Sequence, residues 1–139
     1  MNPVLLDTGA IVAALDRSEH HHEACRAVLE SMRRPLVTCE AVIAEACYLL
    51  RNLPGAPEAV LENIEQGVFQ IPLQIAPSAA AIRRIMRKYA NRKIDLADAC
   101  LIHMANELKT GDILTLDHDF EFYRWGAKRS FELLIPLRR

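Results

Sequence analysis

Four acidic residues that lie far apart in the sequence occupy positions from which their side chains could meet: Asp7, Glu45, Asp98 and Asp117. Carboxylates gathered in a dry pocket repel one another unless a cation lies among them. Because these ligands offer only oxygen, they favour Mg²⁺ or Mn²⁺ over zinc. A divalent ion held by carboxylates lowers the pKa of a bound water and stabilises charge on a phosphoryl oxygen. The pattern therefore predicts metal-dependent hydrolysis of a phosphodiester bond.

The stretch from Ile94 to Ile102 places two carboxylates, those of Asp95 and Asp98, in the first turn of an apolar helix. Apolar residues recur at helical spacing, so one helix face should be buried; they are Ala97, Leu101, Met104, Ala105 and Leu108. The plainer interpretation is a capping pair, with Asp95 as N-cap and Asp98 at N3, because both charges suit the positive end of the helix dipole. The acidic residues elsewhere in the chain favour a site here instead.

Short apolar runs alternate with helical patterns, which predicts an α/β fold with a buried, mainly parallel sheet. The expected strands are Pro3–Leu6, Leu36–Thr38, Val68–Leu73, Ile113–Leu116 and Phe131–Leu137. The expected helices are Ala10–Leu15, Glu19–Arg33, a segment from Thr38 or Cys39, Glu58–Gln66, a segment opened by Pro77 and Ser78, and the one after Asp95; Arg124–Arg129 should be a polar loop. Ligands collect beyond the carboxyl ends of parallel strands, where Asp7 and Asp117 stand.

Glu45 lies in the middle of the third predicted helix, whose residues are apolar on most sides. Burying a glutamate there as an ion is costly without a partner or a metal, which favours a role in the site. The alternative is that Glu45 lies on a narrow exposed stripe, with Arg51 and Asn52 nearby.

Six basic residues occur within eleven positions just before the two aspartates: Arg83, Arg84, Arg87, Lys88, Arg92 and Lys93. A solvated helix face is one interpretation of this cluster. The other is a surface that binds a phosphate backbone next to the acidic site. The three consecutive histidines, His20 to His22, point in different directions on a helix and are expected to form a solvated helix start.

The composition limits what the protein can be. A chain of 139 residues with 51% hydrophobic content suits one domain over residues 1–139. No apolar run approaches the roughly 20 residues of a membrane span, and the N-terminus lacks a signal peptide, so we expect a cytoplasmic protein. Four cysteines without a C-x-x-C pair suit reduced core residues. A net charge of −1 requires that any nucleic-acid binding depend on a local patch.

Four motifs follow one another along the chain: Asp7-Thr8-Gly9, Glu40 to Ala46, Asp95 to Ala99, and Leu114 to Phe120. In this order they resemble the PIN-domain nucleases, and in particular the VapC-type toxins of bacterial toxin–antitoxin pairs. The resemblance implies that Asp7, Glu45, Asp98 and Asp117 are the acidic ligands of Mg²⁺ or Mn²⁺, with Asp119 able to share or replace the role of Asp117. It also implies that Thr8, Asp95 and Thr115 lie beside these ligands.

The same resemblance implies a three-layer α/β/α fold and cleavage of a structured RNA such as transfer RNA. It further implies a homodimer and inhibition by a small antitoxin protein, which we expect to dock on the helices between Ala41 and Gln66. Two alternatives remain open from the sequence. One is a non-catalytic RNA-binding module that uses the basic segment from Arg83 to Lys93, and the other is a nuclease that acts on DNA or on a nucleic-acid structure.

Overall fold

Strand β1 (Val4–Leu6) lies at the centre of a five-stranded sheet in the computed structural model, which describes residues 1–137. The strand order is β3-β2-β1-β4-β7, and every pairing in this sheet is parallel. The other strands are β2 (Leu36–Val37), β3 (Phe69–Gln70), β4 (Asp112–Leu114) and β7 (Glu132–Leu133). The prediction of a parallel sheet is confirmed.

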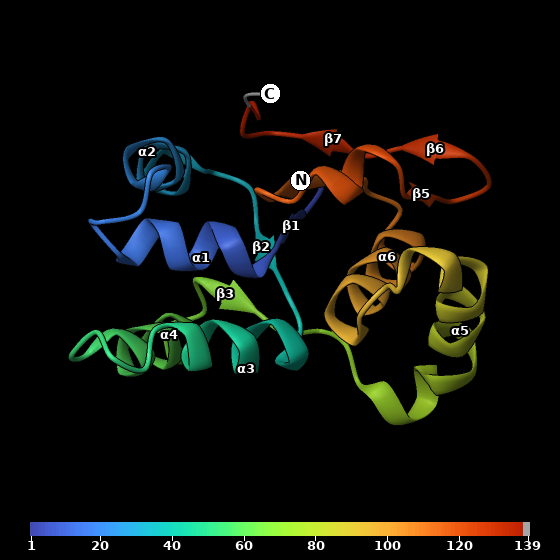
Figure 1. The fold of residues 1–139 in the computed structure, drawn as a ribbon, viewed down its shortest axis with the longest axis horizontal. Helices are drawn as coiled ribbons and strands as arrows, with labels where there is room; N and C mark the ends of the chain where they lie inside the picture. The colour runs from blue at the N-terminus through green and yellow to red at the C-terminus, as the bar shows by residue number, and fades with distance from the viewer. Residues whose placement is uncertain (138–139) are drawn as a thin grey trace.

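Helices flank the sheet on both sides (Figure 1). In that view α1 (Thr8–Leu15), α2 (His22–Ser31), α3 (Glu40–Leu49) and α4 (Ala56–Glu65) lie to the left, and α5 (Ile75–Lys88) and α6 (Leu96–Leu108) lie to the right. All three residues of β1 are completely buried, because both of its faces are covered. The expected α/β/α arrangement is therefore confirmed. Within residues 1–137, no helix is long and apolar enough to cross a membrane.

Helix α2 begins at His22, so His20 and His21 precede it. His22 is buried, and its Nδ1 lies 2.7 Å from the carbonyl oxygen of Ala13 in α1. The prediction of a solvated histidine run is wrong for His22, because α2 packs against α1 and carries this ring into the contact.

Other segments also differ from the sequence-based expectation. Strand β3 is shorter than predicted, and α5 begins at Ile75, so that Pro77 falls within its first turn, where a missing N–H costs nothing. The predicted polar loop forms an antiparallel hairpin of β5 (Arg124–Trp125) and β6 (Arg129–Ser130). Gly126 allows the turn because its φ is +59°.

Candidate active site

Strands β1 and β4 run side by side, and the acid that follows β1 meets the threonine that follows β4. Asp7 Oδ2 accepts a hydrogen bond from the Thr115 hydroxyl at 2.7 Å, and Oδ1 accepts one from the Thr8 amide at 2.8 Å. Asp7 is also the N-cap of α1, so the capping role and the site-facing role coexist. Both Asp7 and Thr115 are buried.

The start of α6 supplies a second buried carboxylate. Asp95 is the N-cap, and its Oδ1 accepts a hydrogen bond from the Asp98 amide at 2.8 Å, as the capping interpretation predicts. Asp95 itself is exposed, whereas Asp98 is only 8% exposed. The cap thus sets the helix start that directs Asp98 inward.

Asp117 completes the cluster from the segment after β4. Its amide donates to the Thr115 hydroxyl oxygen at 3.0 Å, and its Oδ1 accepts a hydrogen bond from the Asp119 amide at 2.9 Å. One carboxylate oxygen each from Asp7, Asp98 and Asp117 lies within 4.8 Å of the others. The structure therefore brings together three of the four acids that the sequence singled out.

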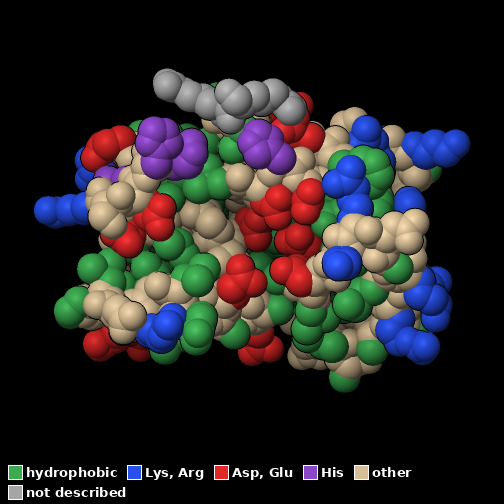
Figure 2. Space-filling model, in the orientation of Figure 1, with side chains coloured by type: hydrophobic (Ala, Val, Ile, Leu, Met, Phe, Trp, Pro, Cys, Tyr) green, Lys and Arg blue, Asp and Glu red, His purple; other side chains and the backbone are tan. Residues whose placement is uncertain are grey.

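The three acids line a cavity of about 450 Å³ at the carboxyl edge of the sheet. Figure 2 shows acidic side chains gathered in a hollow at the centre of one face, with Lys and Arg side chains to the right, on the side of α5. The cavity is lined by Asp7, Thr8, Gly9, Glu45, Asp95, Ala97, Asp98, Leu116, Asp117 and His118. Thr8 and Asp95 thus line the same cavity as the three clustered acids.

Glu45 reaches the same cavity from α3, but it is exposed. The expectation that it is buried is wrong, because α3 buries only one side, through Val42, Ile43 and Ala46. The exposed-stripe alternative is right about solvent exposure. Glu45 nevertheless lies at the rim of the acidic cavity and not in a separate region of the surface.

Burial shifts the ionisation of the clustered acids. It raises the pKa of Asp98 to about 8, and the charges of Asp7 and Asp95 add to this rise. Burial also raises the pKa of Asp7 to about 6, although the hydrogen bond from Thr115 opposes the rise. Partial desolvation at the rim of the cavity raises the pKa of Glu45, and the charge of Asp95 adds to this rise. The cluster therefore holds its full negative charge near neutral pH only with a positive counterion.

The donors of the cavity fit a hard divalent cation. Asp7, Asp98 and Asp117 offer carboxylate oxygens in one place, and no Cys or His belongs to this group of three. Thr8 also lines this cavity, and its buried hydroxyl oxygen has no hydrogen-bond partner among residues 1–137. Oxygen donors of this kind suit Mg²⁺, Mn²⁺ or Ca²⁺ better than zinc.

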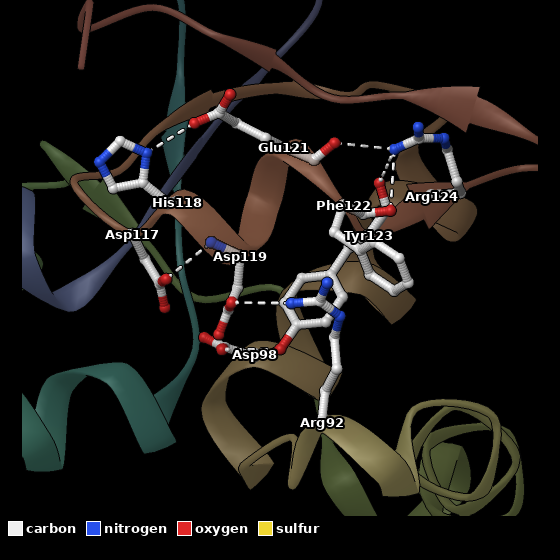
Figure 3. A network of polar contacts seen from close by, with 9 residues as sticks. All are labelled: Arg92, Asp98, Asp117, His118, Asp119, Glu121, Phe122, Tyr123 and Arg124. Atoms are coloured by element: carbon white, nitrogen blue, oxygen red, sulfur yellow. Dashed lines mark hydrogen bonds and ion pairs between the residues drawn. The ribbon is translucent and has the colours of Figure 1, made fainter. Parts of the chain in front are cut away.

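Asp119 lies outside the group of three and contacts a base. Its Oδ1 is 3.3 Å from a guanidinium nitrogen of Arg92, and both side chains are about half-exposed (Figure 3). The guanidinium carbon of Arg92 also lies 3.5 Å from the centroid of the Phe122 ring. Of the six bases in the predicted cluster, Arg92 thus lies at the acidic site. The other five are exposed on or just beyond α5: Arg83, Arg84, Arg87, Lys88 and Lys93.

Two residues at the site did not stand out from their spacing in the sequence. His118 lines the cavity, and its Nδ1 is 2.6 Å from Glu121 Oε1. Tyr123 is buried behind the cluster, with its hydroxyl directed at Asp98. No motif marks Tyr123, because its position depends on the path of the chain between η2 (His118–Glu121) and β5.

Residues 4–126 match the family model described as the PIN domain, so the chain belongs to the PIN-domain family. It is 33% identical to Ribonuclease VapC26 of Mycobacterium tuberculosis (strain ATCC 25618 / H37Rv) over 136 residues, which cover 96% of this chain and 93% of that protein. The fold is also similar to the crystal structure of Mycobacterium tuberculosis VapC20, a toxin that cleaves the sarcin–ricin loop. The TM-score is 0.75 at 16% identity, with 84% of this chain and 91% of that chain covered. Within its family the chain is thus of the VapC type.

Proposed function

We propose that this chain is an endoribonuclease that uses Mg²⁺ or Mn²⁺ to hydrolyse phosphodiester bonds in structured RNA, such as transfer RNA. The observation that carries the proposal is the meeting of Asp7, Asp98 and Asp117 within 4.8 Å, from three separate segments. The similarity to a protein named a ribonuclease supports RNA as the substrate. The similarity in fold to a toxin that cleaves the sarcin–ricin loop supports a structured target.

Some residues of the site would bind the cation, and others would hold those ligands in place. Asp7, Asp98 and Asp117 would hold the cation. Glu45, at the rim of the cavity, and Asp119, which does not line it, are further candidate ligands. When bound, a divalent cation supplies a water of lowered pKa and stabilises charge on a phosphoryl oxygen. The hydrogen bonds from Thr115 and Thr8 hold the Asp7 carboxylate in place. The Asp95 cap fixes the turn that carries Asp98.

The basic side chains on and after α5 would bind the RNA backbone. A chain of net charge −1 needs a local positive patch to attract phosphates, and these exposed side chains lie on the side of the cavity where Figure 2 shows Lys and Arg. Arg92 contacts the acidic residue Asp119, and this exposed ion pair can be exchanged for a contact with a phosphate. Arg92 would therefore hold the backbone next to the site of cleavage.

We further propose that the chain is the toxin of a VapB–VapC pair and that it forms a homodimer. The antitoxin would cover the apolar surface of α3 and α4, where Tyr48, Leu49 and Leu61 are 61%, 53% and 56% exposed. Replacing Leu49 and Leu61 with Glu should prevent neutralisation by the antitoxin and leave RNA cleavage by the free protein unchanged. Neutralisation that persists would exclude this face.

The main test compares substrates and metals directly. The purified protein is incubated with folded RNA and with DNA, each in Mg²⁺, in Mn²⁺ and in chelator. We expect internal cleavage of RNA with either ion and none in chelator. Cleavage of DNA instead would favour the alternative nuclease. RNA binding without cleavage in any ion would favour the non-catalytic module and would overturn the proposal.

A further inference from the structure

Tyr123 lies immediately behind the acidic cluster, although it does not line the cavity. Its side chain is 1% exposed, and its hydroxyl donates to Asp98 Oδ2 at a donor–acceptor distance of 3.5 Å (Figure 3). Within residues 1–137 this carboxylate is the hydrogen-bond partner of the buried hydroxyl. A buried hydroxyl that lost its partner would be destabilising, so the contact constrains both side chains.

The ring of Tyr123 is held by other aromatic rings. It packs edge-to-face against Tyr89, with centroids 4.9 Å apart, and against Phe120, with centroids 5.2 Å apart. Because the ring is held on two sides, its hydroxyl has a fixed position relative to the start of α6. A tyrosine side chain carries a hydroxyl proton, so it can donate a hydrogen bond to a carboxylate oxygen.

Each of the three clustered acids accepts at least one hydrogen bond from the protein, and Asp7 accepts two. Thr115 donates its hydroxyl to Asp7, and the backbone amide of Asp119 donates to Asp117. Tyr123 supplies the corresponding bond to Asp98. Asp98 therefore receives its side-chain hydrogen bond from Tyr123, whereas Asp7 receives the corresponding bond from Thr115.

We propose that Tyr123 is a positioning residue of the cation site. Its hydroxyl binds one oxygen of Asp98 and leaves the other oxygen for the cation. The inference rests on the proposed metal-dependent function. Hydrogen bonds to carboxylate ligands tune a metal site, and their loss typically weakens metal affinity or activity by about 10–100-fold.

The test measures Mn²⁺ binding by calorimetry, without RNA, for the wild type and two matched variants. Tyr123→Phe removes the hydroxyl that faces Asp98. Tyr89→Phe removes a hydroxyl from the same aromatic group, but that hydroxyl accepts a bond from the Arg124 amide at 3.0 Å and faces no acid. We expect about tenfold weaker Mn²⁺ binding for Tyr123→Phe and unchanged binding for Tyr89→Phe. RNA cleavage by Tyr123→Phe should recover as Mn²⁺ is raised.

The outcomes separate this inference from the function it rests on. Equal Mn²⁺ affinity of the wild type and Tyr123→Phe would overturn the role of Tyr123 and leave the metal site intact. Equal weakening by Tyr123→Phe and Tyr89→Phe would also overturn it, because the effect would then come from packing. A wild type that binds no Mn²⁺ would overturn the proposed metal site itself.

A spectroscopic measurement keeps the inference testable if Tyr123→Phe does not fold. The chain has three tyrosines, so a Tyr48→Phe/Tyr89→Phe variant contains Tyr123 alone. Mg²⁺ should change the near-ultraviolet absorption of this tyrosine in a saturable way, at the concentrations at which calorimetry shows Mg²⁺ binding. Binding by calorimetry without any change in tyrosine absorption would contradict the contact with the cation site.

Discussion

The acidic cluster and the basic face of α5 are built in opposite ways. The cluster draws Asp7, Asp98 and Asp117 from three distant segments, and hydrogen bonds hold an oxygen of each. The basic face comes from one helix, and its side chains are exposed: Arg83, Arg84, Arg87 and Lys88. One region fixes atoms in space, whereas the other provides charge on flexible side chains.

This difference indicates which property each region contributes. A cation site needs its ligands within a few tenths of an ångström, so the loss of one ligand should remove activity. Binding of a phosphate backbone depends on the amount of positive charge and is screened by salt. Changes in the cluster should therefore affect the rate of cleavage, and changes in the basic face should affect affinity.

The largest expected effect is that of Asp98→Asn. The change keeps the shape of the side chain but removes a charged ligand, so cleavage should fall about a thousandfold, or about 4 kcal/mol in the barrier. The measurement is single-turnover RNA cleavage, with circular dichroism to check folding. Glu107→Gln, at the exposed far end of the same helix, is the matched control and should cleave normally. Normal cleavage by a folded Asp98→Asn would remove the cluster from the mechanism.

The next effect is on stability, measured by thermal melts in chelator. The pKa of Asp98 rises from 3.8 to about 8 on folding, and that of Asp7 rises from 3.8 to about 6. Between these values the folded state binds more protons than the unfolded state, so the free energy of unfolding falls as the pH rises from about 4 to about 8.

Two further measurements identify the groups that cause this decrease in the free energy of unfolding. Asp98→Asn should flatten the part above about pH 6, where Asp7 no longer contributes. Mg²⁺ should restore stability at about pH 8, because it binds the folded state. A slope that is identical in Asp98→Asn and the wild type would assign the pH dependence to other groups.

A smaller effect is expected on the basic face. Replacing Arg83, Arg84 and Arg87 with Gln should weaken RNA binding about tenfold. It should also lower the slope of log affinity against log salt concentration by about one for each arginine removed. The rate at saturating RNA should not change. Arg26→Gln on α2, where the arginine pairs with exposed Glu30, is the control. A loss of rate without a loss of affinity would contradict the division between the two regions.

The smallest effect is expected for the stability of Arg92→Gln, at the border of the two regions. The Arg92–Asp119 pair is 40% and 44% exposed, so its loss should change the free energy of unfolding by less than about 1 kcal/mol. Denaturant unfolding measures this change. The affinity for RNA should fall by more than it does when any single basic residue on α5 is replaced. A large loss of stability would mean that Arg92 serves the fold and not the substrate.

Local patterns were sufficient to predict part of the site. Asp7 and Asp117 follow apolar runs, and Asp95 and Asp98 form a capping turn, because strand ends and caps depend on nearby residues. The parallel sheet followed from the alternation of apolar runs and helices. These features required no knowledge of how distant segments pack.

The features that the sequence could not predict depend on tertiary contacts. The exposure of Glu45 depends on which side of α3 meets the other helices, and its apolar neighbours gave the wrong answer. The role of Tyr123 depends on the aromatic rings around it and on the path of the chain into β5. The spacing of residues in the sequence indicates neither the exposure of Glu45 nor the role of Tyr123.

The three clustered carboxylates also determine when the site can form during synthesis. A chain still emerging from the ribosome has Asp7 and Asp98 before it has Asp117, and β4 must pair with β1 before Thr115 can reach Asp7. The nascent polypeptide therefore lacks the assembled site until Asp117 and the strand before it have been translated. A ribonuclease site built in this way cannot act before the segment that contains Asp117 has folded onto the rest of the chain.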